Sequence, residues 1–327
     1  FSDRKNIGKY KLDLLPIPED KIIYDERLLE LDSLGFNEFN MLGVKDCSIL
    51  ICNDNKENTF VTHCERMGFR YGLILKGNEC LINYMGYISS PNCIFVIRNY
   101  FNPISYNTAK LCGAESKILH IRGSVNDAFY DLSKSKKSYA KDINWFFGGD
   151  YKTGRKEALK AFIKIPDGKY VLTRQGILDD AMKTDALKIP EYFEIMSRAR
   201  FVPCPVGWVN IETHRVYEAL DAGSIPVMIN NLSNLDQEPN YWKYIFNNSE
   251  IPCVLANTWD SAVGKCLNII DSGNYDDLND KYCNYWRNLN YNWRLQILSF
   301  FNLLKEQKYI KSTNTFYPIA LSNQKKI

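Results

Sequence analysis

The chain has 327 residues, of which 45% are hydrophobic, and carries a formal net charge of +3. This length exceeds what one hydrophobic core usually supports and suits two globular domains. No apolar run approaches the about 20 residues of a membrane-spanning helix, and the small, dispersed charge makes nucleic acid an unexpected partner.

The ten cysteines are irregularly spaced and include no Cys-x-x-Cys pair of the kind that holds zinc. Several lie within apolar runs, where a thiol behaves as a small hydrophobic side chain. We therefore expect mostly reduced, buried cysteines, which favours a reducing compartment such as the cytoplasm. Because the sequence begins at Phe1 rather than at Met, a removed anchor and a Golgi-lumenal location stay open.

Short apolar runs alternate with helical patterns from about Asp46 onward, which is typical of βαβ units and a mostly parallel sheet. The first series predicts strands at 47–52, 71–75, 93–97 and 117–121 and a helix at 59–67. The segment 131–142 follows, is rich in Ser and Lys, and has the composition of a linker. We therefore predict a first domain over residues 1–138.

A second series of the same kind predicts another domain over residues 139–290. Its predicted strands are 143–147, 170–172, 201–204, 225–229 and 252–255, and its predicted helices are 155–163, 190–198, 213–222 and 260–270. Beyond it, Trp293, Ile297, Phe301 and Leu304 recur at the spacing of an amphipathic helix. We expect residues 291–327 to form this helix and a tail that pack across the two domains.

The segment 198–229 contains the most informative pattern. A predicted strand leads into a loop with Pro205 and Gly207, and Thr213 is placed to cap a helix that stops at Gly223. At the carboxyl end of a parallel strand, a glycine loop entering a helix binds phosphate, because backbone N–H groups and the helix dipole point there.

Arg215 and Glu218 lie three residues apart on this predicted helix and share a face. Arg215 could bind a diphosphate, and Glu218 could accept hydrogen bonds from a ribose diol. On the pattern alone, the alternative is an exposed pair of opposite charges. Val216, Ala219 and Leu220 are predicted to form the buried stripe of the same helix.

A second glycine pair follows the strand predicted at 143–147. Gly148 and Gly149 would let the backbone approach a ligand closely, and Arg155 lies near the start of the next helix, within reach of a diphosphate. The alternative is an ordinary tight turn followed by a surface arginine.

These segments resemble the exostosin family of glycosyltransferases, including the ribitol xylosyltransferase type. The matching residues of the longer stretch are Tyr192, Ser197, Phe201, Pro205, Gly207, Arg215, Glu218, Ala219 and Ile225-Pro226-Val227. The second stretch is Trp145-Phe146-Phe147-Gly148-Gly149-Asp150 with Arg155 downstream. The resemblance implies an α/β protein with the GT-B fold. In that fold two Rossmann-like domains with mostly parallel sheets face each other across a cleft, with the nucleotide sugar held by the carboxyl-terminal domain.

The resemblance also implies the activity, which is transfer of a sugar from a nucleotide donor to a hydroxyl of a glycan or polyol. UDP is the preferred carrier, with UDP-xylose or UDP-glucuronate ahead of other donors. Inversion is expected, with no metal and no cofactor, because such enzymes stabilise the leaving diphosphate with helix dipoles and basic side chains. The residues expected to bind the donor are Gly148, Gly149, Arg155, Pro205, Gly207, Thr213, Arg215 and Glu218, of which Glu218 would face the nucleoside.

No residue stands out as the general base that an inverting transfer requires. The weak candidates are Asp54, His63 and Asp150. In the first domain, Arg98 and Asn99 end a predicted strand, at the edge where open α/β sheets bind ligands. We expect them on the acceptor side or in the cleft, and the alternative is a solvated strand end.

A metal site is not expected, because no Asp-x-Asp motif follows a strand and the pairs Asp179-Asp180 and Asp276-Asp277 have solvated settings. The competing hypothesis is a nucleotide-sugar-binding or glycan-binding protein that has lost catalysis on the same scaffold. Dehydrogenases and P-loop enzymes are disfavoured, because the chain lacks the glycine motif of either class.

Overall fold

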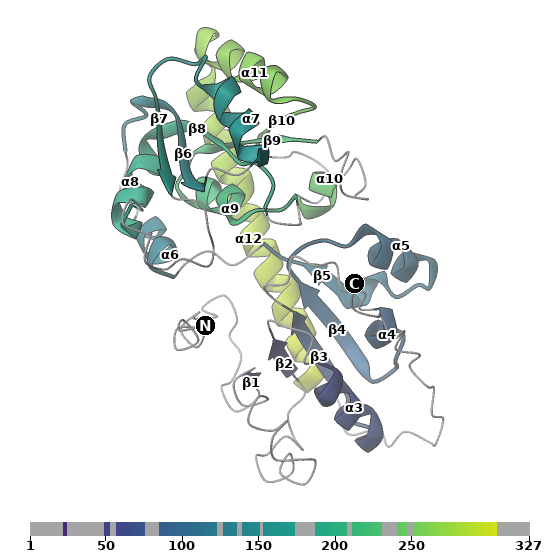
Figure 1. The fold of residues 1–327 in the computed structure, drawn as a ribbon. Coiled ribbons are helices and arrows are strands. Elements are labelled where there is room, and N and C mark those ends of the chain that lie inside the picture. Colours follow the sequence, from purple (N-terminus) through teal and green to yellow (C-terminus); the bar gives the residue numbers. More distant parts are fainter. Residues whose placement is uncertain are drawn as a thin grey trace. The chain divides into compact units, whose positions relative to one another are not determined.

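The chain divides into two compact units, each with its own five-stranded parallel sheet (Figure 1). Unit 1 comprises Phe1–Arg122 with Asn292–Ile327, and unit 2 comprises Gly123–Tyr291. The structure is a computed structural model that describes residues 22–24, 49–52, 57–75, 85–122, 127–135, 139–150, 153–173, 187–207, 211–230, 241–246 and 252–305.

In unit 1 the described strands follow one another across the sheet in chain order, β1-β2-β3-β4-β5, and every neighbouring pair is parallel. The strands are β1 (Ile22–Tyr24), β2 (Ile49–Cys52), β3 (Tyr71–Leu75), β4 (Cys93–Arg98) and β5 (Ile118–His120). The helical elements are α3 (Glu57–Met67), α4 (Met85–Ile88), α5 (Pro103–Leu111) and the 3-10 turn η4 (Glu115–Lys117). Every residue of β4 is buried, as expected for a parallel strand with both faces covered.

In unit 2 the order of the parallel strands is β10-β9-β8-β6-β7. The strands are β6 (Ile143–Asp150), β7 (Gly168–Thr173), β8 (Ala199–Pro203), β9 (Ile225–Ile229) and β10 (Val254–Ala256). The helices are α6 (Asp127–Ser133), α7 (Thr153–Phe162), α8 (Ile189–Arg198), α9 (His214–Asp221), α10 (Tyr241–Ile245), α11 (Trp259–Asp271) and α12 (Tyr275–Lys305), which continues into the residues of unit 1.

The strand order of unit 2 reverses at β6, because β7 pairs with one side of β6 and β8 pairs with the other. Counted from the first strand of the unit, this is the 2-1-3-4-5 order of doubly wound, flavodoxin-like folds. The place where the order reverses, between β6 and β8, is the topological switch point of the sheet.

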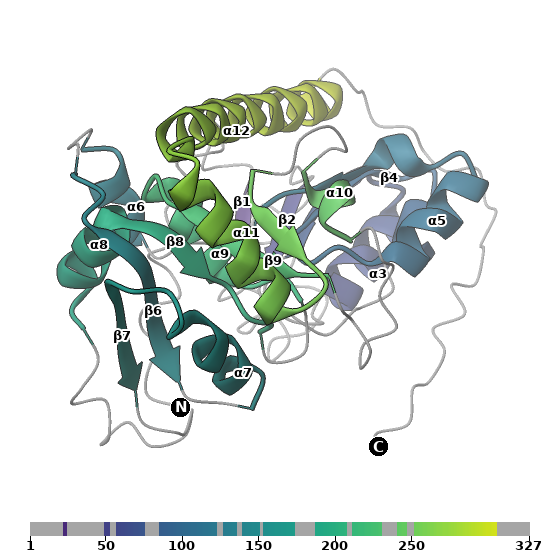
Figure 2. The same cartoon turned by 90° about the horizontal axis from the view of Figure 1, so that it is seen from above.

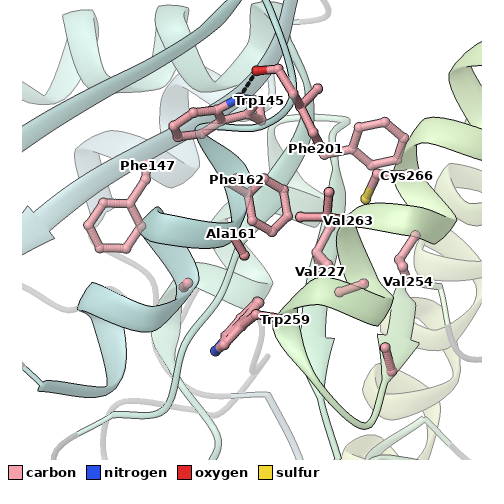
Figure 3. Close-up of a cluster of buried hydrophobic side chains, with 14 of the residues drawn as sticks. Trp145, Phe147, Ala161, Phe162, Phe201, Val227, Val254, Trp259, Val263 and Cys266 are labelled. Carbon is pink, nitrogen blue, oxygen red and sulfur yellow. Dashed lines mark hydrogen bonds between the residues drawn. The ribbon is translucent and has the colours of Figure 1, made fainter.

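Helices cover both faces of this sheet. On one face, side chains from β6, β8, β9 and β10 pack with α7 and α11 into a single apolar cluster (Figure 3). At its edge, the indole Nε1 of Trp145 donates a hydrogen bond to the carbonyl oxygen of Ile165 at 2.9 Å. On the other face, Tyr192 of α8 packs on Phe146, with 5.6 Å between the ring centroids. Helix α6 lies against α8 (Figures 1 and 2).

The predicted mixed α/β fold with parallel sheets is confirmed. The strands predicted at 71–75 and 225–229 have these bounds in the structure. The chain divides after Arg122 rather than at the predicted 138/139, because α6, which includes the start of the predicted linker, packs on α8. The cleft and the packing of 291–327 across both domains stay predictions.

Two further observations concern the described residues alone. Their cysteines form no disulfide with one another, and most of these cysteines are buried. No helix in the described ranges combines the length and the apolar character that crossing a bilayer requires.

Candidate functional site

Open α/β sheets bind their ligands at the topological switch point, outside the carboxyl ends of the strands. In unit 2 this point lies between β6 and β8. Gly148 and Gly149 lie at the carboxyl end of β6. The alternative of an ordinary tight turn at these glycines is wrong, because they extend the strand and pair with Val171 and Leu172 of β7. After β8 the chain continues through Pro205, which is buried, and the half-buried Gly207.

Arg215 of α9 reaches the end of β6. Its Nη2 donates to the carbonyl oxygen of Gly148 at 2.5 Å. Its Cζ lies 4.6 Å from the centroid of the Phe147 ring, within the range of a cation–π contact. Only 8% of Arg215 is exposed, so the alternative of an exposed charged pair is wrong.

The guanidinium of Arg215 has hydrogen-bonding capacity to spare. Its Nε and Nη1 atoms are buried, and neither has a hydrogen-bond partner in the structure as described. Burial lowers the pKa of Arg215, but Tyr192, Cys204 and Glu218 raise it by more, so the pKa is above its ordinary value. The group therefore stays charged, and a ligand that accepts hydrogen bonds would relieve the cost of its unpartnered N–H groups.

Gly149 is required by this arrangement. Its φ of +147° lies in the region that side chains with a Cβ rarely adopt. A Cβ at this position would also lie 2.6 Å from Nη2 of Arg215. The end of β6 can therefore receive the guanidinium only because no side chain stands in its way.

Tyr192 of α8 connects to the second charged residue of α9. Its hydroxyl donates to Oε2 of Glu218 at 3.0 Å. Burial, and then the charge of Glu218, raise the pKa of Tyr192 well above its ordinary value, so the hydroxyl keeps its proton. Glu218 is half-buried and held in one orientation on the same helix as Arg215.

Arg155 lies in the first turns of α7, close to the end of β6. Its Nη1 is 3.8 Å from Oδ2 of Asp150 and donates to the carbonyl oxygen of Asp150 at 3.3 Å. The arginine side chain is 15% exposed and the aspartate side chain 28%. The loop after β8 also approaches this turn, because a Cβ on Gly154 would lie 3.6 Å from Cγ2 of Val206. The first turn of α7 and the loop after β8 therefore meet beside Arg155.

The start of α9 is capped as the sequence predicts. Oγ1 of Thr213 accepts a hydrogen bond from the backbone N–H of Arg215 at 3.4 Å. The predicted buried stripe of Val216, Ala219 and Leu220 is confirmed, with at most 5% of any of the three exposed. The helix thus presents a fixed amino terminus near the switch point.

Sequence reasoning missed Glu212, which precedes the cap. It is 1% exposed and accepts hydrogen bonds from the hydroxyls of Tyr217 and Tyr241. The signal that could have revealed it is a carboxylate placed just before a capping threonine, where the chain turns into the helix.

Other predicted residues belong to unit 1. Arg98 is the last residue of β4 and Asn99 follows it, as expected, but they are 2% and 3% exposed, so the alternative of a solvated strand end is wrong. Nε of Arg98 donates to the carbonyl oxygens of Asn99 and Tyr100 at 3.1 and 3.0 Å. Asp54 lies outside the described residues, and the side chain of His63 in α3 is not described. Their roles stay predictions.

The structure describes only one of the two aspartate pairs that were predicted from the sequence to be solvated rather than metal-binding. Asp276 and Asp277 are exposed in the first turn of α12, as expected for solvated carboxylates. Asp179 and Asp180 lie outside the described residues. In the ranges that are described, no three His, Cys, Asp or Glu side chains come together as metal ligands would.

Residues 126–279 match the family described as RXYLT1 C-terminal domain. The matched range contains the β6 end, Arg155, Tyr192 and the whole of α9. A solved structure titled "Crystal Structure of alpha1,3-Fucosyltransferase" is also similar, with 12% identity, a TM-score of 0.42, and coverage of 83% of this chain and 81% of that chain. Comparison with curated protein sequences gave no match.

The family match identifies the protein as a glycosyltransferase. Over residues 126–279 the family match confirms the predicted resemblance to ribitol xylosyltransferase-like proteins. The wider resemblance to exostosins stays a prediction.

Proposed function

We propose that this glycosyltransferase takes its sugar from a UDP-sugar, such as UDP-xylose or UDP-glucuronate, that binds at the switch point of unit 2. The acceptor is a hydroxyl of a glycan or polyol, and transfer inverts the anomeric carbon without a metal. One observation carries the proposal, which is the buried, charged guanidinium of Arg215 with two unpartnered nitrogen atoms at the end of β6.

The diphosphate of the donor is the group that this guanidinium suits. Phosphate oxygens accept charge-assisted hydrogen bonds from arginine in fixed geometry. Arg155 lies near the same strand end and adds a second positive charge. The amino terminus of α9 adds the positive end of a helix dipole. These three features support a dianionic ligand rather than a neutral one.

Glu218 supports a nucleoside next to the diphosphate. Its Oε2 accepts from Tyr192, which orients the carboxylate, and its Oε1 can accept from a ribose hydroxyl. Arg215 and Glu218 are one helical turn apart, so a ligand bridging them would place its phosphates and its ribose side by side.

In the proposed reaction, the bond between the anomeric carbon and the phosphate oxygen breaks as the acceptor oxygen bonds to the opposite face of that carbon. The acceptor hydroxyl passes its proton to a general base, for which Asp54, His63 and Asp150 are the predicted candidates, and the electron pair of the broken bond stays on the nucleoside diphosphate. Arg155 and Arg215 would stabilise this developing charge, which is the task that a divalent cation performs in other transferases.

Replacing Arg155 with Met tests the proposal, with Arg198→Met as the matched control. Arg198 makes an ion pair with Asp142, which immediately precedes the first residue of β6 and so lies away from the proposed site. The distances are 2.9 Å from Nε to Oδ1 and 2.5 Å from Nη2 to Oδ2. We expect UDP and UDP-sugars to raise the Tm of the wild type and R155M to weaken UDP binding by roughly 10- to 100-fold. R198M should bind UDP as the wild type does.

Turnover is then measured with each UDP-sugar that binds, with and without EDTA. Product formation that survives EDTA supports a metal-independent transferase. If no nucleoside diphosphate changes the Tm, the proposal fails. Tight donor binding with no transfer or hydrolysis of any donor would instead support the competing hypothesis of a binding protein.

A further inference from the structure

Glu212 is a buried carboxylate with its own hydrogen-bond donors. It is 1% exposed, and the hydroxyl of Tyr241 donates to its Oε2 at 2.6 Å. The hydroxyl of Tyr217 donates to its Oε1. Burying a carboxylate is costly unless its oxygens accept hydrogen bonds, so the two tyrosines are part of what keeps Glu212 in place.

The position of Glu212 in the chain indicates that its contact with Tyr217 fixes the start of α9. Thr213 is the N-cap of α9, so Glu212 is the residue just before the cap, and Tyr217 is the fourth residue of the helix. A contact between these two positions fixes the angle at which the chain enters a helix. In most helices the contact is apolar, whereas here a carboxylate and a phenol make it.

Tyr241 and Trp286 fix this turn to the rest of unit 2. Tyr241 belongs to α10, is fully buried, and contacts Glu212 from outside α9. Tyr217 stacks on Trp286 of α12, with 5.9 Å between ring centroids and 20° between the ring planes. The indole Nε1 of Trp286 donates to Oδ1 of Asp221, the last residue of α9. The helix is therefore held at both ends.

Arg215 and Glu218 flank Tyr217 on this helix, so a shift of its first turns would displace both. We propose that Glu212 is a positioning residue, which acts through Tyr217 and Tyr241 to hold the amino terminus of α9 in the geometry that binds the donor diphosphate. This inference rests on the proposed function, because it assigns a role toward the same ligand.

Replacing Tyr241 with Phe tests the inference, with Tyr275→Phe as the matched control. Both changes remove the hydroxyl of a buried tyrosine, and the hydroxyl of Tyr275 donates to the carbonyl oxygen of Arg200 at 3.2 Å, away from α9. We expect similar losses in Tm. UDP should bind Y241F about tenfold more weakly than the wild type, whereas Y275F should bind it unchanged.

Replacing Glu212 with Gln provides the second variant, because the amide keeps the size of the side chain and can still accept from one hydroxyl. With the UDP-sugar that the wild type uses, E212Q should raise the KM for donor by more than it lowers kcat. The combination of E212Q and Y241F should weaken UDP binding by less than the product of the two single effects, since both act through one network.

The outcomes separate this inference from the proposed function. If the wild type does not bind UDP, the proposed function fails first. If the wild type binds UDP and both Y241F and E212Q bind it as tightly as Y275F does, the inference is overturned while the proposed function stands. A loss of Tm with unchanged UDP affinity has the same meaning, because it shows a structural role only.

Discussion

A half-buried histidine in unit 1 should make the stability of that unit depend on pH. The ring of His120, at the end of β5, lies edge-on to Phe101 with 4.6 Å between ring centroids. Arg98 occupies the paired position on the neighbouring strand. Burial, and then the charge of Arg98, lower the pKa of His120 from 6.5 to about 3. The folded protein therefore keeps this ring neutral in mild acid.

Since the pKa of His120 is lower in the folded state than in the unfolded state, the unfolded state binds more protons between pH 6.5 and about 3. The free energy of unfolding should fall as the pH drops through this window, by at most about 1.4 kcal/mol per pH unit from this group. His120→Phe keeps a ring against Phe101 and cannot titrate. Urea unfolding at about pH 7 and about pH 5 should therefore show a smaller acid-dependent loss for H120F than for the wild type. Parallel losses in the two proteins would show that His120 does not contribute.

At the scale of single residues, sequence spacing identified Arg215 and Glu218 but not their surroundings. Arg215 is buried by its contacts with Phe147 and Gly148, and the latter is 67 residues away in the chain. No local pattern reveals such a contact. The contact between Glu212 and Tyr241 was missed for the same reason, because Tyr241 comes from a separate helix.

Two helices of unit 2 begin with the same kind of cap. Oγ1 of Thr213 accepts from the backbone N–H of Arg215 at 3.4 Å, and Oγ1 of Thr258 accepts from that of Ser261 at 3.2 Å. The first cap starts α9, which we propose to bind the donor, and the second starts α11. Comparing variants of the two capping threonines therefore distinguishes the effect of a cap on stability from its effect on donor binding.

Replacing either threonine with Ala removes a cap and should lower the free energy of unfolding by about 1 kcal/mol. Only T213A should also weaken UDP binding, because it loosens the turn that carries Arg215. Urea denaturation measures the first effect and calorimetric titration with UDP the second. Equal UDP affinity in the two variants would argue against a donor site at α9.

For helices and strands, the predicted bounds were correct where the apolar residues of the segment itself reveal its burial. Strands β3 and β9 are short, mostly aliphatic runs that contain Gly72 and Pro226, and their bounds were predicted. Helix α5 was missed because Ile104 and Leu111 point outward and are 66% and 89% exposed, which removes the periodic stripe. Helix α6 was missed because it is short, and its burial depends on Phe129, which packs on Phe193 with 5.0 Å between ring centroids.

At the scale of the whole molecule, unit 2 has the parts that an independent domain needs. It contains a complete sheet, helices on both faces and one continuous apolar cluster. The sequence predicted two α/β domains correctly in kind, because each series of strands and helices carries its own apolar residues. The division after Arg122 depends on the docking of α6, which is a tertiary contact without a local signal.

The fragment Gly123–Tyr291 should therefore fold alone, with a single cooperative urea transition. It should bind UDP with nearly the affinity of the full chain, because the proposed donor site is made by unit 2 alone. Sugar transfer should be lost, because the acceptor residues are predicted in unit 1. Calorimetric titration of the fragment checks the first expectation, and a folded fragment that does not bind UDP would contradict it.

The guanidinium of Arg215 gives up its hydration when the protein folds, not when a ligand arrives. An anion that reaches this charge loses only its own water, and mobile ions of the solution cannot come between the two once they are in contact. Salt screens exposed charges strongly and buried charges weakly. The affinity of this site for an anion should therefore persist at ionic strengths at which the same anion dissociates from a surface arginine.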